Sequence, residues 1–129
     1  MTRLLLDTHL VLWWLADDPR LPAGLENHIQ APGNEVFVSQ ASLWEMAIKQ
    51  SLGRLQVDLP ELERQIPLQG FQWLPIRNAH LLAVAELPSG GDHRDPFDRL
   101  LVCQSRVEPM LLLSVDRQLQ RYGSTVQLL

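Results

Sequence analysis

Leu4-Leu5-Leu6-Asp7, an apolar run that ends at a carboxylate, sets a pattern that the rest of this chain repeats. A short, uninterrupted apolar run is typical of a β-strand that is buried on both faces. Apolar residues then follow at near-helical spacing from Leu10 to Leu15, and Pro19 marks the end of that spacing. Residues 4–6 are therefore predicted to form a strand, which is followed directly by a helix.

The same succession of strand and helix recurs along the chain. Further strands are predicted at 36–38, 71–76, 110–113 and 126–128, with helices at 22–30, 40–52, 60–69, 79–87 and 96–107, a helical turn at 116–122 and a loop at 88–92. Ser39, Asn78 and Asp95 are the expected helix caps. Apolar strands that alternate with helices predict an α/β fold, a three-layer α/β/α sandwich with a central, mainly parallel sheet.

Length and composition narrow the class of protein. The chain has 129 residues, of which 46% are hydrophobic and 20% charged, which predicts a single globular domain over residues 1–129. Its longest apolar stretch, from Leu10 to Ala16, is far shorter than the ~20 residues of a membrane span. The early Asp7 argues against a secretion signal, and the single cysteine, Cys103, excludes an internal disulfide. These features predict a cytoplasmic protein that does not bind membranes.

The net charge bears on nucleic-acid binding. Fifteen acidic residues against eleven basic ones give a formal charge of −4. Such a chain is not expected to coat nucleic acid by bulk attraction, because the phosphate backbone would repel it. The charge leaves open a protein that meets a phosphate group through bound metal ions.

Four acidic residues occupy the positions where a parallel sheet places its ligands. Asp7 and Asp116 come just after apolar strands, and Glu45 and Asp98 lie early in helices that follow strands. Ligands of open α/β sheets bind outside the carboxyl ends of the strands. The four carboxylates are therefore expected to converge on one pocket.

Each of these residues also has a simpler structural explanation. Asp7 and Asp116 could cap the helices that follow them. Glu45 could pair with Lys49, four residues on. Asp95-Pro96-Phe97-Asp98 is close to a capping box with proline in the first turn. For any one residue taken alone, the structural explanation is the stronger.

Helix periodicity nevertheless places two of the acids on the inward side. Glu45 lies on an apolar stripe with Ile48 and Leu52, and Asp98 lies beside the stripe of Leu101 and Val102. Four converging carboxylates repel one another, so at least one should hold its proton unless cations are present. Two divalent ions would neutralise them, and oxygen ligands favour Mg²⁺, with Mn²⁺ as the alternative. Such a site activates water for phosphodiester hydrolysis, which predicts a metal-dependent nuclease.

Four segments, in order, resemble the acidic motifs of the PIN-domain family. They are Leu5-Leu6-Asp7-Thr8-His9, residues 38–49, residues 93–101, and Leu113-Ser114-Val115-Asp116 followed by Tyr122-Gly123. Their order and spacing are similar to those of the VapC-like toxins of bacterial toxin–antitoxin modules over nearly the whole chain. The resemblance implies a Mg²⁺-dependent endoribonuclease that acts on single-stranded RNA, a cognate antitoxin as protein partner, and a homodimer.

The resemblance also implies roles for particular residues. Asp7, Glu45, Asp98 and Asp116 match the catalytic, metal-binding quartet. Asp95 is a less certain fifth ligand, since the Asp95-Pro96 pair explains it as a helix cap. Thr8 and Ser114 occupy hydroxyl positions that could orient carboxylates or water, although the family often has threonine where this chain has Ser114. Three residues near the third motif are candidate RNA contacts: His93, Arg94 and Arg99. His9 is expected to pack rather than to act as a general base.

Other functions are compatible with parts of this pattern. One alternative is a catalytically silent PIN-like binding module that acts through a protein partner, but the presence of all four acids argues against it. Another is a phosphotransfer domain with Asp7 as the nucleophile. Asp7-Thr8-His9 lacks the second acid, two residues on, that a phosphatase of that kind needs, and Lys49 is poorly placed for the lysine of such sites. Trp13, Trp14 and Trp44 are expected chiefly in the core, and Cys103 in a buried helix face.

Overall fold

The computed structural model describes residues 2–88, 91 and 93–129. Three residues of the loop predicted at 88–92 therefore lie outside the described residues: Ser89, Gly90 and Asp92. Across the described ranges, no helix has both the length and the apolar character that crossing a membrane requires.

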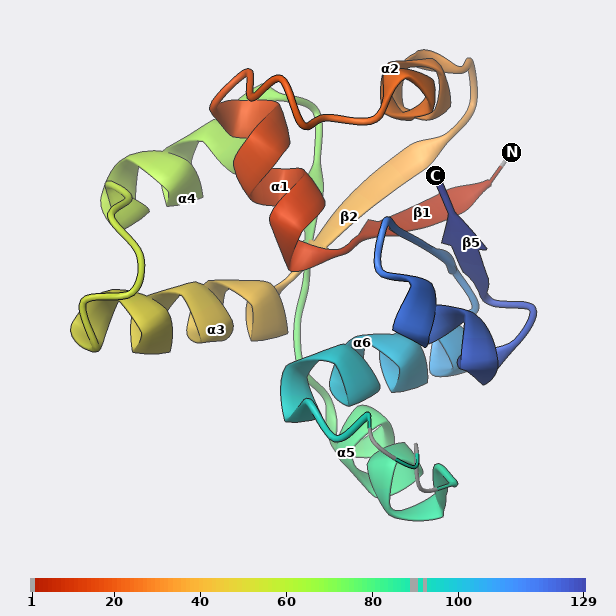
Figure 1. Cartoon of the computed structure of the whole chain (residues 1–129). Helices are drawn as coiled ribbons and strands as arrows, with labels where there is room; N and C mark the ends of the chain where they lie inside the picture. The colour runs from red at the N-terminus through yellow and green to blue at the C-terminus, as the bar shows by residue number, and fades with distance from the viewer. Residues whose placement is uncertain (1, 89–90, 92) are drawn as a thin grey trace.

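The centre of the molecule is a five-stranded sheet with the order β3-β2-β1-β4-β5 (Figure 1). The strands are β1 (Arg3–Leu6), β2 (Glu35–Ser39), β3 (Gln72–Leu74), β4 (Leu111–Ser114) and β5 (Val126–Leu128). Every neighbouring pair is parallel. The predicted parallel sheet is thus confirmed, and all five strands lie at or within about two residues of their predicted ranges.

The helices follow the predicted order. They are α1 (Thr8–Leu15), α2 (Ala23–Gln30), α3 (Gln40–Ser51), α4 (Leu59–Leu68), α5 (Asn78–Glu86), α6 (Pro96–Val107) and the short 3₁₀ helix η1 (Arg117–Tyr122). The prediction that Asn78 caps its helix is wrong by one residue, because Arg77 occupies the cap position. The side chain of His80 accepts the backbone N–H of Arg77 at 3.0 Å, and this bond stabilises the earlier start.

Alternate residues of the strands face opposite layers of helices. Leu5 and Leu112 belong to a core cluster shared with α5, α6 and η1. Leu4, Leu6 and Leu113 belong to a second cluster shared with α1, α2 and α4. Side chains alternate across a strand, so uninterrupted apolar strands supply both cores. This is the predicted three-layer α/β/α sandwich, with helices on both faces of the sheet (Figure 1).

The strand order reverses at β1. The chain runs outward from β1 through β2 to β3, and then crosses to β4 on the other side of β1. In open parallel sheets, a crevice forms outside the carboxyl ends of the two strands at such a reversal. Leu6 pairs with Leu113 there, so the residues that follow β1 and β4 emerge side by side.

Of the three tryptophans expected chiefly in the core, one differs from the prediction. Trp13 and Trp14 are half-buried and pack against the second core cluster, whereas Trp44 is 54% exposed. Trp44 packs edge-on against Phe97, with ring centroids 4.9 Å apart, where α3 meets α6. The expected burial of Trp44 was therefore wrong. The expected burial of Cys103 is confirmed.

Candidate active site

Asp7 follows β1 directly, caps α1 and lies in the candidate site. Its Oδ1 accepts the backbone N–H of Thr8 at 2.8 Å, and its Oδ2 accepts the hydroxyl of Ser114 at 2.6 Å. Only 3% of the residue is exposed. Burial raises the pKa of the carboxyl, and the two hydrogen bonds offset this effect only in part.

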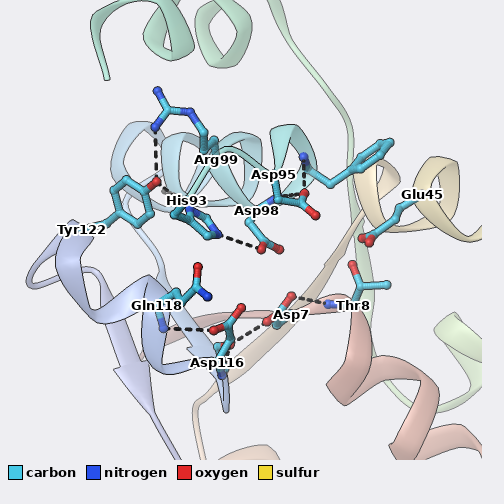
Figure 2. A network of polar contacts seen from close by, with 12 residues as sticks. Asp7, Thr8, Glu45, His93, Asp95, Asp98, Arg99, Asp116, Gln118 and Tyr122 are labelled. Carbon is cyan, nitrogen blue, oxygen red and sulfur yellow. Dashed lines mark hydrogen bonds and ion pairs between the residues drawn. The ribbon is translucent and has the colours of Figure 1, made fainter. Parts of the chain in front are cut away.

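Asp116 lies beside Asp7 because β4 lies beside β1. It caps η1 by accepting the N–H of Gln118 at 2.9 Å through Oδ1. Its own backbone N–H donates to the hydroxyl of Ser114 at 3.0 Å. The Ser114 hydroxyl thus donates to the carboxylate of Asp7 and accepts from the backbone N–H of Asp116, so it links the two residues. Figure 2 shows Asp7 and Asp116 side by side.

Asp95 and Asp98 begin α6. The Oδ1 of Asp95 accepts the N–H groups of Phe97 and Asp98, at 2.9 and 3.1 Å, as expected for a helix cap. The pKa of Asp98 is raised to about 8, first by burial and then by the negative charges of Asp7, Asp95, Glu45 and Asp116. This agrees with the expectation that one converging carboxyl holds a proton. It also means that all these acids lie within electrostatic reach of one another.

Glu45 faces inward from α3, as its place on the apolar stripe predicted. The residue is 4% exposed, and its Oε2 accepts the ammonium group of Lys49 at 2.8 Å. Its Oε1 is buried without a hydrogen-bond partner, alone in this respect among the side-chain atoms of the described residues. A buried carboxylate oxygen without a partner is costly, which points to a ligand. Nearby, Thr8 donates its hydroxyl to Ser42 at 2.8 Å and links α1 to α3.

His93 is part of the acidic site. Its Nε2 lies 3.1 Å from the Oδ2 of Asp98, and its Nδ1 lies 2.8 Å from the hydroxyl of Tyr122. One ligating atom from each of His93, Asp98 and Asp116 falls within 4.8 Å of the others, a spacing that suits a metal ion. Figure 2 shows these side chains directed toward one region, with Asp7 and Glu45 beside them.

The three candidate RNA contacts lie in different surroundings. His93 is buried, whereas Arg94 is exposed and contacts the carbonyl of Gly91 at 3.4 Å. Arg99 donates to the backbone carbonyls of Leu87 and Pro88 and to the hydroxyl of Tyr122. For His93 and Arg99, these internal contacts indicate a structural role. An RNA contact by any of the three stays a prediction.

The donor set of the site fits a hard divalent cation. Asp7, Glu45, Asp98 and Asp116 offer oxygen ligands, and Lys49 is the cation paired with one of them. Oxygen-only sites favour Mg²⁺ or Mn²⁺, and the partnerless Oε1 of Glu45 gains a partner if a cation binds. The residues present therefore fit such an ion.

Sequence reasoning missed Tyr122 as a site residue. Tyr122 ends η1, and its hydroxyl reaches His93 at 2.8 Å although 29 residues separate them. The only sequence signal was its place after the fourth motif, which says nothing about where its side chain points. A second miss is the double role of Lys49, which both pairs with Glu45 and lies within electrostatic reach of Asp95 and Asp98.

The chain is similar to known proteins in sequence and in fold. Ribonuclease VapC22 of Mycobacterium tuberculosis (strain ATCC 25618 / H37Rv) is 28% identical over 131 residues, which span 95% of this chain and 93% of the relative. VapBC2 from Rickettsia felis, solved bound to a DNA fragment from their promoter, has a chain that matches with a TM-score of 0.72 and 15% identity, over 98% of this chain and 97% of that one.

A second solved structure, VapBC-1 from nontypeable Haemophilus influenzae, matches with a TM-score of 0.68 and 16% identity, over 99% of this chain and 97% of that one. At such low identity, the two structural likenesses show the shared fold. The family model described as PIN domain matches residues 4–124, which takes in all four acidic segments. The chain belongs to the PIN-domain family.

Proposed function

We propose that this protein is a divalent-metal-dependent endoribonuclease that acts as the toxin of a toxin–antitoxin pair. The observation that carries the proposal is the convergence of Asp7, Glu45, Asp98 and Asp116 where the strand order reverses, with one buried oxygen of Glu45 lacking a partner. The name of the M. tuberculosis relative, a ribonuclease, supports the reaction class. The VapBC complexes among the structural neighbours support the pairing with an antitoxin.

The four carboxylates would have different roles in binding the metal. Asp7, Asp98 and Asp116 would hold one Mg²⁺ or Mn²⁺, directly or through water, and Glu45 would hold a second ion or orient the attacking water. A divalent ion bound there supplies water activation and stabilises negative charge on the phosphate. Because no ribose hydroxyl is needed as nucleophile, the expected products carry 5′-phosphate and 3′-hydroxyl ends.

The protein's own contacts would keep these ligands in place. Ser114 and the N–H of Thr8 hold both oxygens of Asp7, so that carboxylate cannot rotate freely. Lys49 occupies Oε2 of Glu45 and leaves Oε1 for another partner. The same contact argues against the phosphotransfer alternative, because Lys49 is paired with Glu45 rather than with Asp7.

A cleft beside the site supports an RNA substrate. Its volume is about 340 Å³, and its lining includes Thr8 and Lys49, each adjacent to a proposed ligand. The lining also holds Arg20 and Arg54, with Asp18 as its acidic residue. Arg20 forms an ion pair with Asp18 and Lys49 forms one with Glu45, so Arg54 supplies the positive charge that remains in the lining. Such a cleft suits a single RNA strand whose phosphates need neutralisation.

The same acidic site would also suit a basic segment of an antitoxin. An arginine of the partner could displace the metal and form forked hydrogen bonds to the carboxylates. The cytoplasmic location, the inhibition by this partner and the homodimer in this proposal rest on the family resemblance.

The test is incubation of the purified protein with total RNA, with Mg²⁺ or with EDTA, followed by mapping of the cleaved ends. Cleavage should require the metal and should be lost in Asp7→Asn. Glu63→Gln, which changes an exposed carboxylate of α4, is the matched control and should cleave normally. Undiminished cleavage by folded Asp7→Asn, or by the EDTA-treated protein, would overturn the proposal. Intact RNA after incubation with the folded, metal-loaded protein would favour the silent binding module.

A further inference from the structure

A chain of hydrogen bonds leads from the surface to Asp98. Arg99 donates from Nη1 to the hydroxyl of Tyr122 at 3.2 Å, and that hydroxyl lies 2.8 Å from Nδ1 of His93. On the other side of the imidazole ring, Nε2 lies 3.1 Å from Oδ2 of Asp98. Figure 2 shows the four side chains in this order. We refer to Arg99, Tyr122 and His93 as the relay.

The chemistry of the groups gives the relay a direction. A guanidinium group only donates, so the Tyr122 oxygen accepts from Arg99 and its single hydrogen is free for His93. Of the two tautomers of a neutral His93, the one that uses this hydrogen accepts it at Nδ1 and carries its own proton on Nε2. That proton faces Oδ2 of Asp98, which can only accept when the carboxylate is ionised, as a metal ligand must be.

The relay is anchored in the fold. Arg99 also donates to the carbonyls of Leu87 and Pro88, at 3.1 and 3.0 Å, so its guanidinium is held at a fixed place beside α6. Tyr122 and His93 are 6% and 5% exposed, and their rings pack edge to face with centroids 5.5 Å apart. Rotation of the Tyr122 or His93 side chain would break these buried contacts.

We propose that the relay consists of positioning residues that hold Asp98 for metal binding, and that His93 is not itself a ligand. A ligating nitrogen must offer a lone pair, and the relay places a hydrogen on the only nitrogen that faces the site. With Oδ2 of Asp98 held by that hydrogen, Oδ1 would be the oxygen left to bind a cation. The inference rests on the proposed function in one respect, that the site binds a divalent cation. It opposes the alternative that the close group of His93, Asp98 and Asp116 forms a three-residue metal site.

The first test uses the unaltered protein. In ¹⁵N-labelled, Mg²⁺-saturated protein, two-bond ¹H–¹⁵N correlation spectra report which imidazole nitrogen carries the proton. His93 should be protonated on Nε2 and unprotonated on Nδ1. His80 is an internal reference, because its Nδ1 accepts the backbone N–H of Arg77 and its Nε2 faces Glu108. A proton on Nδ1 of His93, or loss of the Nε2 proton when Mg²⁺ is added, would overturn the inference.

The second test measures Mn²⁺ affinity by electron paramagnetic resonance, without RNA. Tyr122→Phe removes the hydroxyl and keeps the ring, and it should weaken binding about 10- to 100-fold, the usual effect of losing an outer partner of a ligand. Thr125→Val removes a hydroxyl that contacts Ser105 and should bind Mn²⁺ normally. His93→Gln keeps an N–H donor and should bind more tightly than His93→Ala, which keeps none.

The outcomes separate the relay from the proposed function. Wild-type Mn²⁺ affinity in folded Tyr122→Phe, or equal affinities of His93→Gln and His93→Ala, would overturn the relay and leave the nuclease proposal standing. Failure of the unaltered protein to bind Mn²⁺ would overturn both. Normal binding, with the expected losses in the variants but without RNA cleavage, would support the relay and overturn the nuclease.

Discussion

The two ends of α6 each place a buried histidine beside a carboxylate, with opposite electrostatic results. At the carboxyl end, Glu108 faces Nε2 of His80 at 2.5 Å and forms ion pairs with Arg77 and Arg3. At the amino end, Asp98 faces His93 at 3.1 Å but is surrounded by other acids. The first carboxylate is matched by cations within the protein, and the second is not.

The pKa values of the two carboxyls move in opposite directions. Burial acts to raise the pKa of Glu108, but hydrogen bonds from His80 and Arg77 outweigh it and the pKa is lowered. Burial raises the pKa of Asp98 to about 8, and the neighbouring carboxylates add to the effect. A histidine partner alone therefore does not decide whether a carboxylate is ionised, because the sum of nearby charges does.

This difference separates a cluster that the fold satisfies by itself from the cluster that we propose as functional. The charge of Glu108 is matched by groups of the protein. The Asp98 cluster is left electrostatically incomplete, which disfavours the metal-free protein and favours a cation that completes it. Perturbed carboxyl groups gather at functional sites for this reason.

The substitution Asp98→Asn should give the largest difference between the two ends of α6. We expect RNA cleavage to fall about 1000-fold or more, because a bound cation contributes several kcal/mol to stabilising the transition state. The melting temperature of the metal-free variant should not fall, since the change removes one of the repelling carboxyls. Glu108→Gln is the matched control at the other end of α6 and should cleave normally. Equal losses of cleavage in both variants would contradict the assignment of Asp98 to the proposed site and of Glu108 to a structural cluster.

Mg²⁺ should stabilise the protein through the amino end of α6 alone. At a free concentration 100 times its Kd, Mg²⁺ should add about 2.7 kcal/mol to the free energy of unfolding. Urea unfolding with Mg²⁺ and with EDTA measures this difference. The gain should persist in Glu108→Gln and vanish in Asp98→Asn. A gain of the same size in Asp98→Asn would mean that the cation binds elsewhere.

Glu108→Gln tests the structural end. The substitution removes the charge that accepts from Arg77 and His80, and it should lower the free energy of unfolding by about 2 kcal/mol. Urea unfolding in EDTA gives the value without any metal contribution. Unchanged stability would show that the ion pairs of Glu108 are no stronger than ordinary surface pairs.

The contributions of Asp98 and Glu108, at the two ends of α6, to the free energy of unfolding should change with pH in opposite directions. Below pH 8 a proton must leave Asp98 for a cation to bind, so Mg²⁺ affinity should rise about tenfold per pH unit and then level off. In metal-free protein, the free energy of unfolding should fall as the pH rises from about 4 to 8, because native Asp98 keeps a proton that the unfolded chain has lost.

Glu108 should act in the opposite sense. Its lowered pKa contributes stability above the ordinary value of 4.5, and that stability is lost as the pH falls through the lower folded value. Isothermal titration at several pH values, and urea unfolding across the same range, measure both effects. A Mg²⁺ affinity that does not change between pH 6 and 8 would contradict the raised pKa of Asp98.

The alternation of strands and helices could be predicted because its signals are local. Short apolar runs, bounded by turn residues and caps, mark each element, and the parallel sheet follows from strands that are apolar on both faces. The strand order β3-β2-β1-β4-β5 could not be predicted, because the sequence of one apolar strand does not specify which strand pairs with it in the sheet. The exposure of Trp44 was likewise misjudged, since it depends on how α3 meets α6.

The structure shows that the cap and site interpretations of the acids are compatible. Asp7 and Asp116 each accept a backbone N–H at the start of the following helix, and both lie within electrostatic reach of Asp98. A carboxylate has two oxygens, and one can cap while the other serves the site. Capping a helix therefore does not exclude Asp7 or Asp116 from the proposed site.

From the sequence alone came the layered fold class, the inward placement of Glu45 and Asp98, and the position of Asp7 and Asp116 at strand ends, because periodicity, capping and strand ends are written within short stretches of chain. Only the tertiary structure decided which groups surround each acid. The Ser114 hydroxyl that holds Asp7 lies 107 residues away, and the tyrosine behind His93 lies 29 residues away. Such contacts depend on which strands become neighbours and on how η1 turns back over α6, and both are set by packing of the whole chain.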